Sequence, residues 1–324
     1  MKVGFIGLGT MGAFMAANLS KYLEKSNHGF VVHDVRKSAA EPFIAQGAEW
    51  ADSPKAVAEK CDLVFLSLPG PKEVEAVATD AATGILAGLK KGGAVFDLST
   101  NSPTVVRRIA AIYKEKGVTF MDAPVSGGPT GARTGKLAIW VGGEKKVFDE
   151  SKAFLDAFAD QARYIGEIGA GSVAKLVHNG AGYTIQAGLA ELFTMGVKGG
   201  VEPLALWEAI RTGAGGRGRT FDRLVDQFLV NKYEPPAFAL KLAFKDMTLA
   251  TELGRELGVP MRLANMAYAE MSEAMARGWD AQDSRSPMKL QIERAGVDIA
   301  VDPKRIEQVF ERDPPAQGDP KRAK

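Results

Sequence analysis

Three glycines near the start of the chain have the spacing of a turn that binds phosphate. They form a G-x-G-x-x-G pattern between an apolar stretch at residues 3–6 and a stretch of helical periodicity at 11–25. In such a turn Gly7 permits the tight bend, Gly9 lets the backbone approach a pyrophosphate, and Gly12 lets the helix pack on the strand. The N–H groups at the helix start would face the anion. The predicted contacts are Gly7, Leu8, Gly9, Thr10, Met11 and Gly12.

Asp34 supports the assignment of this turn to a dinucleotide. It follows the next apolar stretch, residues 30–32, about 20 positions beyond the last glycine of the turn. A carboxylate there accepts hydrogen bonds from the ribose hydroxyls of NAD, and its charge repels the 2′-phosphate of NADP. Arg36 and Lys37 follow directly, and a nearby cation can accommodate that phosphate. The sequence therefore predicts NAD as the cofactor, with NADP as the alternative.

Small and polar residues follow two further stretches that we expect to be strands. Ser126, Gly127 and Gly128 can present a hydroxyl and backbone N–H groups to a carboxylate. Thr100 follows the apolar stretch at 94–98, and the carboxyl ends of strands are where open α/β sheets bind ligands. Both places are therefore candidate contacts for small molecules.

The elements that must position these residues alternate through the first half of the chain. Short apolar stretches begin near residues 3, 30, 63, 94, 120 and 137, and helical patterns lie between most of them. This alternation predicts an α/β Rossmann domain with a doubly wound, mostly parallel sheet.

After residue 169 the pattern becomes helical and no convincing strand follows. Helical periodicity covers residues 172–197, 203–211, 221–230, 240–257 and 263–277. We therefore expect a Rossmann domain at 1–165, an all-helical domain for substrate and oligomer contacts at 166–299, and a C-terminal tail at 300–324 that is rich in Pro and charged residues.

The composition excludes several other classes of protein. The chain has 324 residues and a net charge of +2, a balance that gives no reason to expect nucleic acid or a membrane surface as a partner. Its one cysteine, Cys61, cannot form an intrachain disulfide, and no long apolar run indicates a membrane span. No His, Cys and Asp cluster has the spacing of a metal site. We expect a cytoplasmic protein without a metal.

Four segments, in order, resemble the 3-hydroxyisobutyrate dehydrogenase family, also called the β-hydroxyacid dehydrogenases. They are the glycine turn and its helix at residues 4–19, the Asp-Ala-Pro-Val-Ser-Gly-Gly segment at 122–128, the segment 169–179, and the segment 238–247. The resemblance covers about residues 1 to 290 and implies a Rossmann domain, a helical domain and a dimer or tetramer. It also implies that residues 126–128 bind substrate.

The resemblance assigns the proton-transfer role to Lys175. This residue and Asn179 lie at positions i and i+4, and so on one face of the predicted helix. The lysine would exchange the hydroxyl proton as hydride leaves the same carbon, and the asparagine would help to hold the substrate. The resemblance further implies cofactor contacts at Leu68, Pro69, Thr100 and Lys245.

The sequence therefore predicts an oxidoreductase that transfers hydride between NAD(P) and a small 3-hydroxy acid similar to 3-hydroxyisobutyrate. Two alternatives stay open: an NADPH-dependent reductase of short aldehydes or keto acids, and a non-catalytic NAD-binding sensor. A glycine and arginine loop at residues 213–219 departs from the family pattern. Its Arg217 and Arg219 are candidate contacts for a second anionic group or for a partner subunit.

Overall fold

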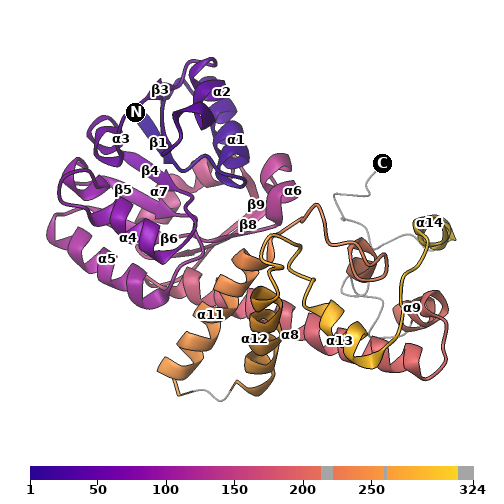
Figure 1. Cartoon of the computed structure of the whole chain (residues 1–324). Helices are drawn as coiled ribbons and strands as arrows, with labels where there is room; N and C mark the ends of the chain where they lie inside the picture. Colours follow the sequence, from indigo (N-terminus) through magenta and orange to yellow (C-terminus); the bar gives the residue numbers. More distant parts are fainter. Residues whose placement is uncertain (213–221, 259–260, 313–324) are drawn as a thin grey trace. The chain divides into compact units, whose positions relative to one another are not determined.

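The computed structural model describes residues 1–212, 222–258 and 261–312. The chain forms two compact units, Met1–Val177 and His178–Lys324 (Figure 1). The division falls inside one continuous helix, α8 (Ala170–Lys198). The sequence boundary at residue 165 stays a prediction.

The first unit is built on one mostly parallel sheet, whose strand order is β3-β2-β1-β4-β5-β6-β8-β7, with β9 paired to β8. Only the pairings of β8 with β6 and β7 are antiparallel. This order brings the carboxyl ends of β1, β2, β4 and β5 to one edge, which is the ligand edge of an open parallel sheet. The strands are β1 (Lys2–Ile6), β2 (Gly29–His33), β3 (Glu49–Trp50), β4 (Leu63–Leu66), β5 (Ala94–Asp97), β6 (Thr119–Asp122), β7 (Val125–Ser126), β8 (Leu137–Gly142) and β9 (Ala159–Gly166).

Helices cover both faces of this sheet because alternate strand residues point to opposite faces. One core joins Val3 and Phe5 of β1 to Met15 of the first helix, and the other joins Ile6 to Ile109. The predicted Rossmann fold is thereby confirmed. The helices are α1 (Gly12–Lys25), α2 (Glu41–Ile44), α3 (Pro54–Lys60), α4 (Pro71–Thr79), α5 (Pro103–Glu115), α6 (Gly128–Thr134) and α7 (Lys145–Leu155), with 3-10 helices η1 (Lys37–Ala39) and η2 (Ile85–Ala87).

The regular secondary structure in the described residues of the second unit is helical, apart from one isolated bridge between Ala239 and Asp283. Two apolar clusters stabilise it, one around Trp207 and Phe228 and the other around Met247. The prediction of an all-helical domain is confirmed. Besides the later part of α8, its helices are α9 (Pro203–Thr212), η3 (Arg223–Asp226), α11 (Leu240–Glu256), α12 (Arg262–Ala276), α13 (Met288–Ala295) and α14 (Pro303–Arg312).

Two predictions for this unit differ from the structure. The described part of the helix expected at 221–230 is only the 3-10 helix η3 followed by a turn. Within the expected tail at 300–324, α14 is a helix whose Ile306 and Val309 are buried in the Trp207 cluster. The apolar residues of α14 have helical spacing, but the many charged residues around them favour the prediction of a tail. Residues 313–324 lie outside the described part of the chain.

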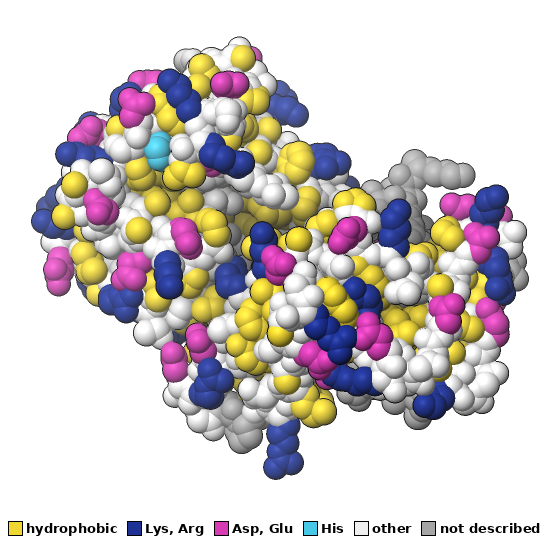
Figure 2. All heavy atoms as spheres, viewed as in Figure 1, with side chains coloured by type: hydrophobic (Ala, Val, Ile, Leu, Met, Phe, Trp, Pro, Cys, Tyr) yellow, Lys and Arg dark blue, Asp and Glu magenta, His cyan; other side chains and the backbone are white. Residues whose placement is uncertain are grey.

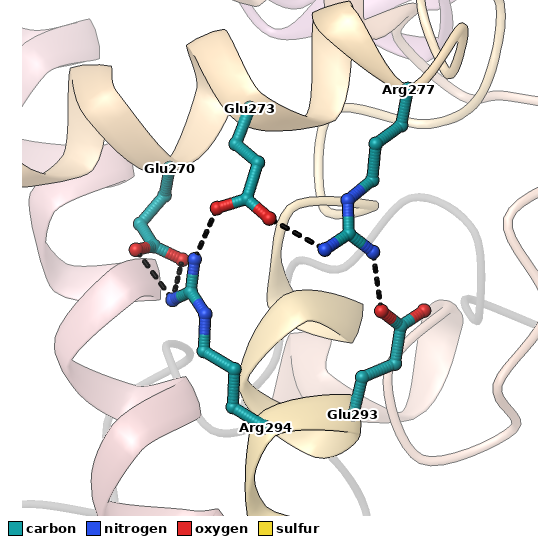
Figure 3. A network of polar contacts seen from close by, with 5 residues as sticks. All are labelled: Glu270, Glu273, Arg277, Glu293 and Arg294. Carbon is teal, nitrogen blue, oxygen red and sulfur yellow. Dashed lines mark hydrogen bonds and ion pairs between the residues drawn. The ribbon is translucent and has the colours of Figure 1, made fainter.

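Ion pairs join α12 to α13 on the surface of this unit (Figure 3). Arg294 binds Glu270 and Glu273, while Arg277 binds Glu273 and Glu293. The shared Glu273 holds two guanidinium groups, so its pKa lies below the ordinary value, chiefly through its hydrogen bond with Arg277.

Acidic and basic side chains are interspersed on the face drawn in Figure 2, as the near-neutral net charge leads one to expect. Among the described residues, no helix is long and apolar enough to cross a bilayer.

Candidate active site

The three glycines of the turn meet different surroundings, which correspond to their expected roles. A Cβ at Gly7, where φ is +94°, would lie 2.2 Å from the Ser67 carbonyl oxygen, and one at Gly12 would lie 1.9 Å from the Gly7 carbonyl oxygen. At Gly9 a Cβ would meet nothing within 4 Å. Gly7 and Gly12 are therefore required by the fold itself, whereas the space beside Gly9 is free for a ligand to approach the backbone.

The start of α1 has the features of an anion site. No side chain caps its N-terminus, and its first turn carries no acidic residue. The unpaired N–H groups and partial positive charge of a helix start suit a pyrophosphate. Thr10 is exposed and Met11 is half-buried at this end, while Leu8 is buried. The turn therefore fits a dinucleotide.

Asp34 connects the end of β2 to the glycine turn. Its Oδ2 accepts the backbone N–H of Leu8 at 2.7 Å, and its Oδ1 accepts that of Arg36 at 2.8 Å. Only 8% of Asp34 is exposed, and the Arg36 Nε lies 3.8 Å from Oδ1. Each carboxylate oxygen keeps a second acceptor direction, so ribose hydroxyls can still bind.

The loops after β4 and β5 are fixed to each other. The backbone N–H of Leu68 donates to Ser99 Oγ at 2.9 Å, and Asp97 accepts from the Ser99 N–H at 3.0 Å and from Asn101 Nδ2 at 2.8 Å. Burial raises the pKa of Asp97 to about 6. Thr100 is half-buried in the second loop, and Pro69 is exposed in the first.

The predicted substrate loop is a turn between β7 and α6. Gly127 has a φ of +134° and Gly128 a φ of +62°, which are conformations that favour glycine. Ser126 and Gly128 are half-buried and Gly127 is exposed, so the loop is accessible to a ligand. Asn18 of α1 donates through Nδ2 to the Ala132 carbonyl at 2.8 Å, which connects α6 to the cofactor helix.

Lys175 lies half-buried near the start of α8. That helix start is held by Asp122, the last residue of β6. Its Oδ1 accepts the N–H of Gly169 at 2.7 Å, and its Oδ2 accepts that of Ser172 at 2.6 Å. The compact unit Met1–Val177 thus contains the glycine turn, the substrate loop and Lys175.

Asn179 and Lys245 belong to the second unit, where both contact Asp246. Asn179 Nδ2 donates to Asp246 Oδ2 at 2.6 Å, and Lys245 Nζ lies 3.1 Å from Asp246 Oδ1. His178 Nδ1 lies 3.1 Å from Asn179 Oδ1. Asp246 is only 1% exposed, so a buried carboxylate orients two of the predicted site residues.

Three buried carboxylates in or near recognised motifs had no role assigned from the sequence: Asp97, Asp122 and Asp246. Asp122 and Asp246 belong to segments that resemble the family, and Asp97 lies shortly before Thr100, which was the available signal. Charged groups are almost never fully buried without partners, so their burial indicates a structural task. Among the described residues, no three His, Cys, Asp or Glu side chains form a group that could hold a metal ion.

Two family profiles match successive parts of the chain. The NAD binding domain of 6-phosphogluconate dehydrogenase matches residues 2–166. The NAD-binding domain of NADP-dependent 3-hydroxyisobutyrate dehydrogenase matches residues 169–291.

Individual relatives match over most of their length. 2-(Hydroxymethyl)glutarate dehydrogenase of Eubacterium barkeri is 33% identical over 93% of this chain and 98% of its own. The NAD-dependent L-serine dehydrogenase of Pseudomonas aeruginosa is 31% identical over 89% of this chain and 97% of its own. The solved structure of 3-hydroxyisobutyrate dehydrogenase from Mycobacterium tuberculosis with L-serine has a TM-score of 0.78 and 28% identity, covering 89% of this chain and 98% of that one.

The glycine turn, the two-unit fold and these matches confirm the family and the enzyme class that the sequence predicted. The chain belongs to the 3-hydroxyisobutyrate dehydrogenase family of NAD(P)-dependent oxidoreductases, which act on the CH–OH group of hydroxy acids.

Proposed function

We propose that the enzyme oxidises a small 3-hydroxy acid similar to 3-hydroxyisobutyrate, with NAD as the preferred cofactor. The observation that carries the proposal is the content of one compact unit: a turn that fits a dinucleotide, an accessible loop that suits a carboxylate, and a lysine on a fixed helix start. The substrates named for the relatives, 2-(hydroxymethyl)glutarate and L-serine, both carry a hydroxymethyl group on the carbon next to a carboxylate.

The preference for NAD rests on Asp34. Its carboxylate is held in place by two backbone N–H groups, so its charge would stay beside the ribose and repel a 2′-phosphate. Arg36 lies near the same carboxylate. This ion pair partly neutralises the arginine, which could otherwise bind the 2′-phosphate of NADP.

In the proposed mechanism the residues of this chain bind the acid and move one proton. The Ser126 hydroxyl and the backbone N–H groups of Gly127 and Gly128 hold the substrate carboxylate. Lys175, in its neutral form, accepts the hydroxyl proton during oxidation, and its ammonium form returns the proton during reduction. Asn179 orients the substrate. The bound nicotinamide supplies the hydride acceptor.

Replacement of Lys175 tests this proposal. Because general acid–base catalysis contributes about 10²–10⁴-fold, Lys175→Ala should lower kcat by at least about a hundredfold. The dissociation constant of NADH, measured by fluorescence titration, should stay near wild type because the glycine turn is untouched. Lys175→Arg should not restore activity, since guanidinium does not release its proton near neutral pH.

The matched control is Lys198→Ala, which removes an exposed lysine from the far end of the same helix and should leave kcat unchanged. The pH profile of kcat/KM should contain one deprotonation that is absent in Lys175→Ala. If Lys175→Ala keeps kcat within about threefold of wild type, the residue is not the acid–base group. Lys245 would then be tested next.

A substrate screen addresses the reaction itself. A panel of 3-hydroxy acids and short aldehydes, each offered with NAD and with NADP, is followed by the absorbance of the reduced cofactor. Rapid NAD reduction by a 3-hydroxy acid supports the proposal. Exclusive aldehyde or keto acid reduction with NADPH would instead support the alternative reductase.

A homodimer or homotetramer, which the family resemblance implies, is a further part of this proposal. So are a cytoplasmic location and the division into domains at 1–165 and 166–299. The hypothesis that Arg217 and Arg219 bind a second anionic group concerns a loop outside the described residues.

A further inference from the structure

Asp122 lies where the substrate loop and the catalytic helix begin. It is the last residue of β6 and is 1% exposed, and its neighbour in the sheet is Gly142 of β8. Residues 123–125 lead from Asp122 to Ser126. The carboxylate accepts two backbone N–H groups from the start of α8, at 2.7 and 2.6 Å.

The start of α8 has no side chain of its own that can perform this task. Helix starts leave backbone N–H groups unpaired, and a Ser, Thr, Asp or Asn just before the helix usually accepts one of them. That position is Gly169 here, which has no side chain. Asp122 supplies both acceptor oxygens from 47 and 50 positions away in sequence. Its negative charge also suits the positive end of the helix dipole.

Glycines on both sides allow this close approach. A Cβ at Gly171 would lie 2.2 Å from the Trp140 carbonyl oxygen and 2.7 Å from that of Asp122. A Cβ at Gly142 would lie 2.5 Å from Asp122 Oδ1. A side chain at either place would push the helix away from the strands, so both glycines are needed for the carboxylate to reach the helix start.

The position of Lys175 follows from that arrangement. Ser172, which donates to Asp122, is one helical turn before the lysine, and a rigid helix transmits its placement. The Asp122 carboxylate thus fixes the start of the helix that carries the proton-transfer group, and its backbone ends the strand that precedes the substrate loop.

We propose that Asp122 is a positioning residue, which holds Lys175 in register with the substrate loop at residues 126–128 through its two hydrogen bonds to the start of α8. The inference rests on the proposed role of Lys175 in the reaction. Asp122 does not contact substrate in this role; it acts only through the lysine.

The first test replaces Asp122 with Asn, which preserves shape but turns one acceptor oxygen into a donor that faces an N–H group. A misplacement of about 1 Å can lower a rate by about 10²-fold, so Asp122→Asn should lower kcat by at least about tenfold. The dissociation constant of NADH should stay within about threefold of wild type, since the glycine turn is not involved. As a control, Ser53→Ala removes the side-chain cap of α3 in the same unit and should leave kcat unchanged.

A double-mutant cycle separates positioning from a general loss of structure. In a Lys175→Ala background there is no lysine left to position, so Asp122→Asn should change the residual kcat by no more than about twofold. A decrease by the same factor in both backgrounds would overturn the inference, and so would an unchanged kcat in Asp122→Asn alone.

The two proposals fail in different ways. If Lys175→Ala is fully active, the assigned role of the lysine is wrong and this inference falls with it. If Lys175→Ala is inactive and Asp122→Asn is fully active, only the inference is wrong. Should Asp122→Asn not fold, Asp122→Glu retains the charge, moves the carboxylate by one methylene, and carries the same expectations in both backgrounds.

Discussion

Asp34 makes contacts that give it two tasks at once. Its position after β2 makes it the proposed contact for the ribose, and it also fixes the turn through the Leu8 N–H. A substitution at this residue is therefore expected to alter both nucleotide choice and the stability of the turn, and the two effects must be measured separately.

Asp34→Asn should raise KM for NAD by at least about tenfold, because a hydrogen bond to a charged group contributes about 1.5–3 kcal/mol. The variant should use NADP better than wild type does, since the charge that repels the 2′-phosphate is gone. Initial rates with both nucleotides, together with a thermal melt for the turn, measure these effects. A wild-type enzyme that already prefers NADP strongly would contradict the weight placed on this carboxylate.

Arg36→Ala is the matched control, because Arg36 is an exposed residue two positions after Asp34. If Asp34 sets the preference, this variant should leave KM for NAD nearly unchanged and weaken any residual use of NADP. A large loss with NAD would mean that the arginine, rather than the aspartate, holds the ribose.

At this scale the sequence indicates tasks that a residue performs within its own turn, but not tasks that depend on distant partners. The tasks of Gly7, Gly9 and Gly12 follow from their spacing, because each acts within its own turn. Asp122 and Asp246 contact groups that are 47 to 67 positions away in sequence, so only the folded chain reveals their partners.

Among the elements, the carboxyl ends of the parallel strands carry the loops of the predicted site. Asp97 ends β5 and accepts hydrogen bonds within the loop that carries Thr100, while Ser99 connects that loop to Leu68. Because Asp97 is 1% exposed, its burial raises its pKa from 3.8 to about 6.

This raised pKa predicts a pH-dependent stability for the loop region. The folded protein binds this proton more tightly than the unfolded chain, so the stabilising contribution is complete below pH 3.8 and is lost as the pH rises through about 6. Asn does not titrate at this position. The free energy of unfolding of Asp97→Asn minus that of wild type should therefore increase by about 2 kcal/mol between about pH 4 and pH 7.

Urea unfolding at a series of pH values measures this difference, and titrations elsewhere in the protein cancel in it. Any pH-independent loss of stability caused by the altered hydrogen bonds shifts the difference equally at every pH and leaves its dependence on pH unchanged. A difference that is flat across this range would show that Asp97 ionises in the fold as it does in water.

Elements with strong periodicity were predicted from the sequence, and those that depend on tertiary contacts were not. The helices at 172–197, 240–257 and 263–277 were anticipated to within a few residues. β3 and β7 are two residues long, and β9 alternates exposed polar residues at the edge of the sheet. None of these three strands has an apolar pattern long enough to be recognised from the sequence, because each is defined by its pairing with a neighbouring strand.

For the whole molecule, the proposed oligomer depends on the apolar surface that the second unit leaves exposed. On α8, Phe193 packs into its own unit, whereas Ile185 is 49% exposed. On α12, Leu263 and Met266 are 67% and 57% exposed. These side chains are candidates for burial against another subunit.

Ile185→Lys should therefore shift the protein toward the monomer, because a charge buried without a partner opposes association. Sedimentation velocity at micromolar concentration measures the change against wild type. Ile112→Lys, at an exposed isoleucine on α5, is the control and should leave the assembly intact. A wild-type protein that sediments only as a monomer would refute the proposed oligomer.

The boundary between the two compact units determines which site residues would stay together in a hybrid gene. The division follows Val177, so it falls between Lys175 and Asn179 on one unbroken helix. A hybrid gene joined there would take its cofactor turn, substrate loop and lysine from one parent as a single block, and its asparagine and Asp246 from the other. Because the junction lies within a helix, two parents whose α8 segments align without a gap would form a continuous helix across it. The part that carries the dinucleotide turn would then be inherited without interruption.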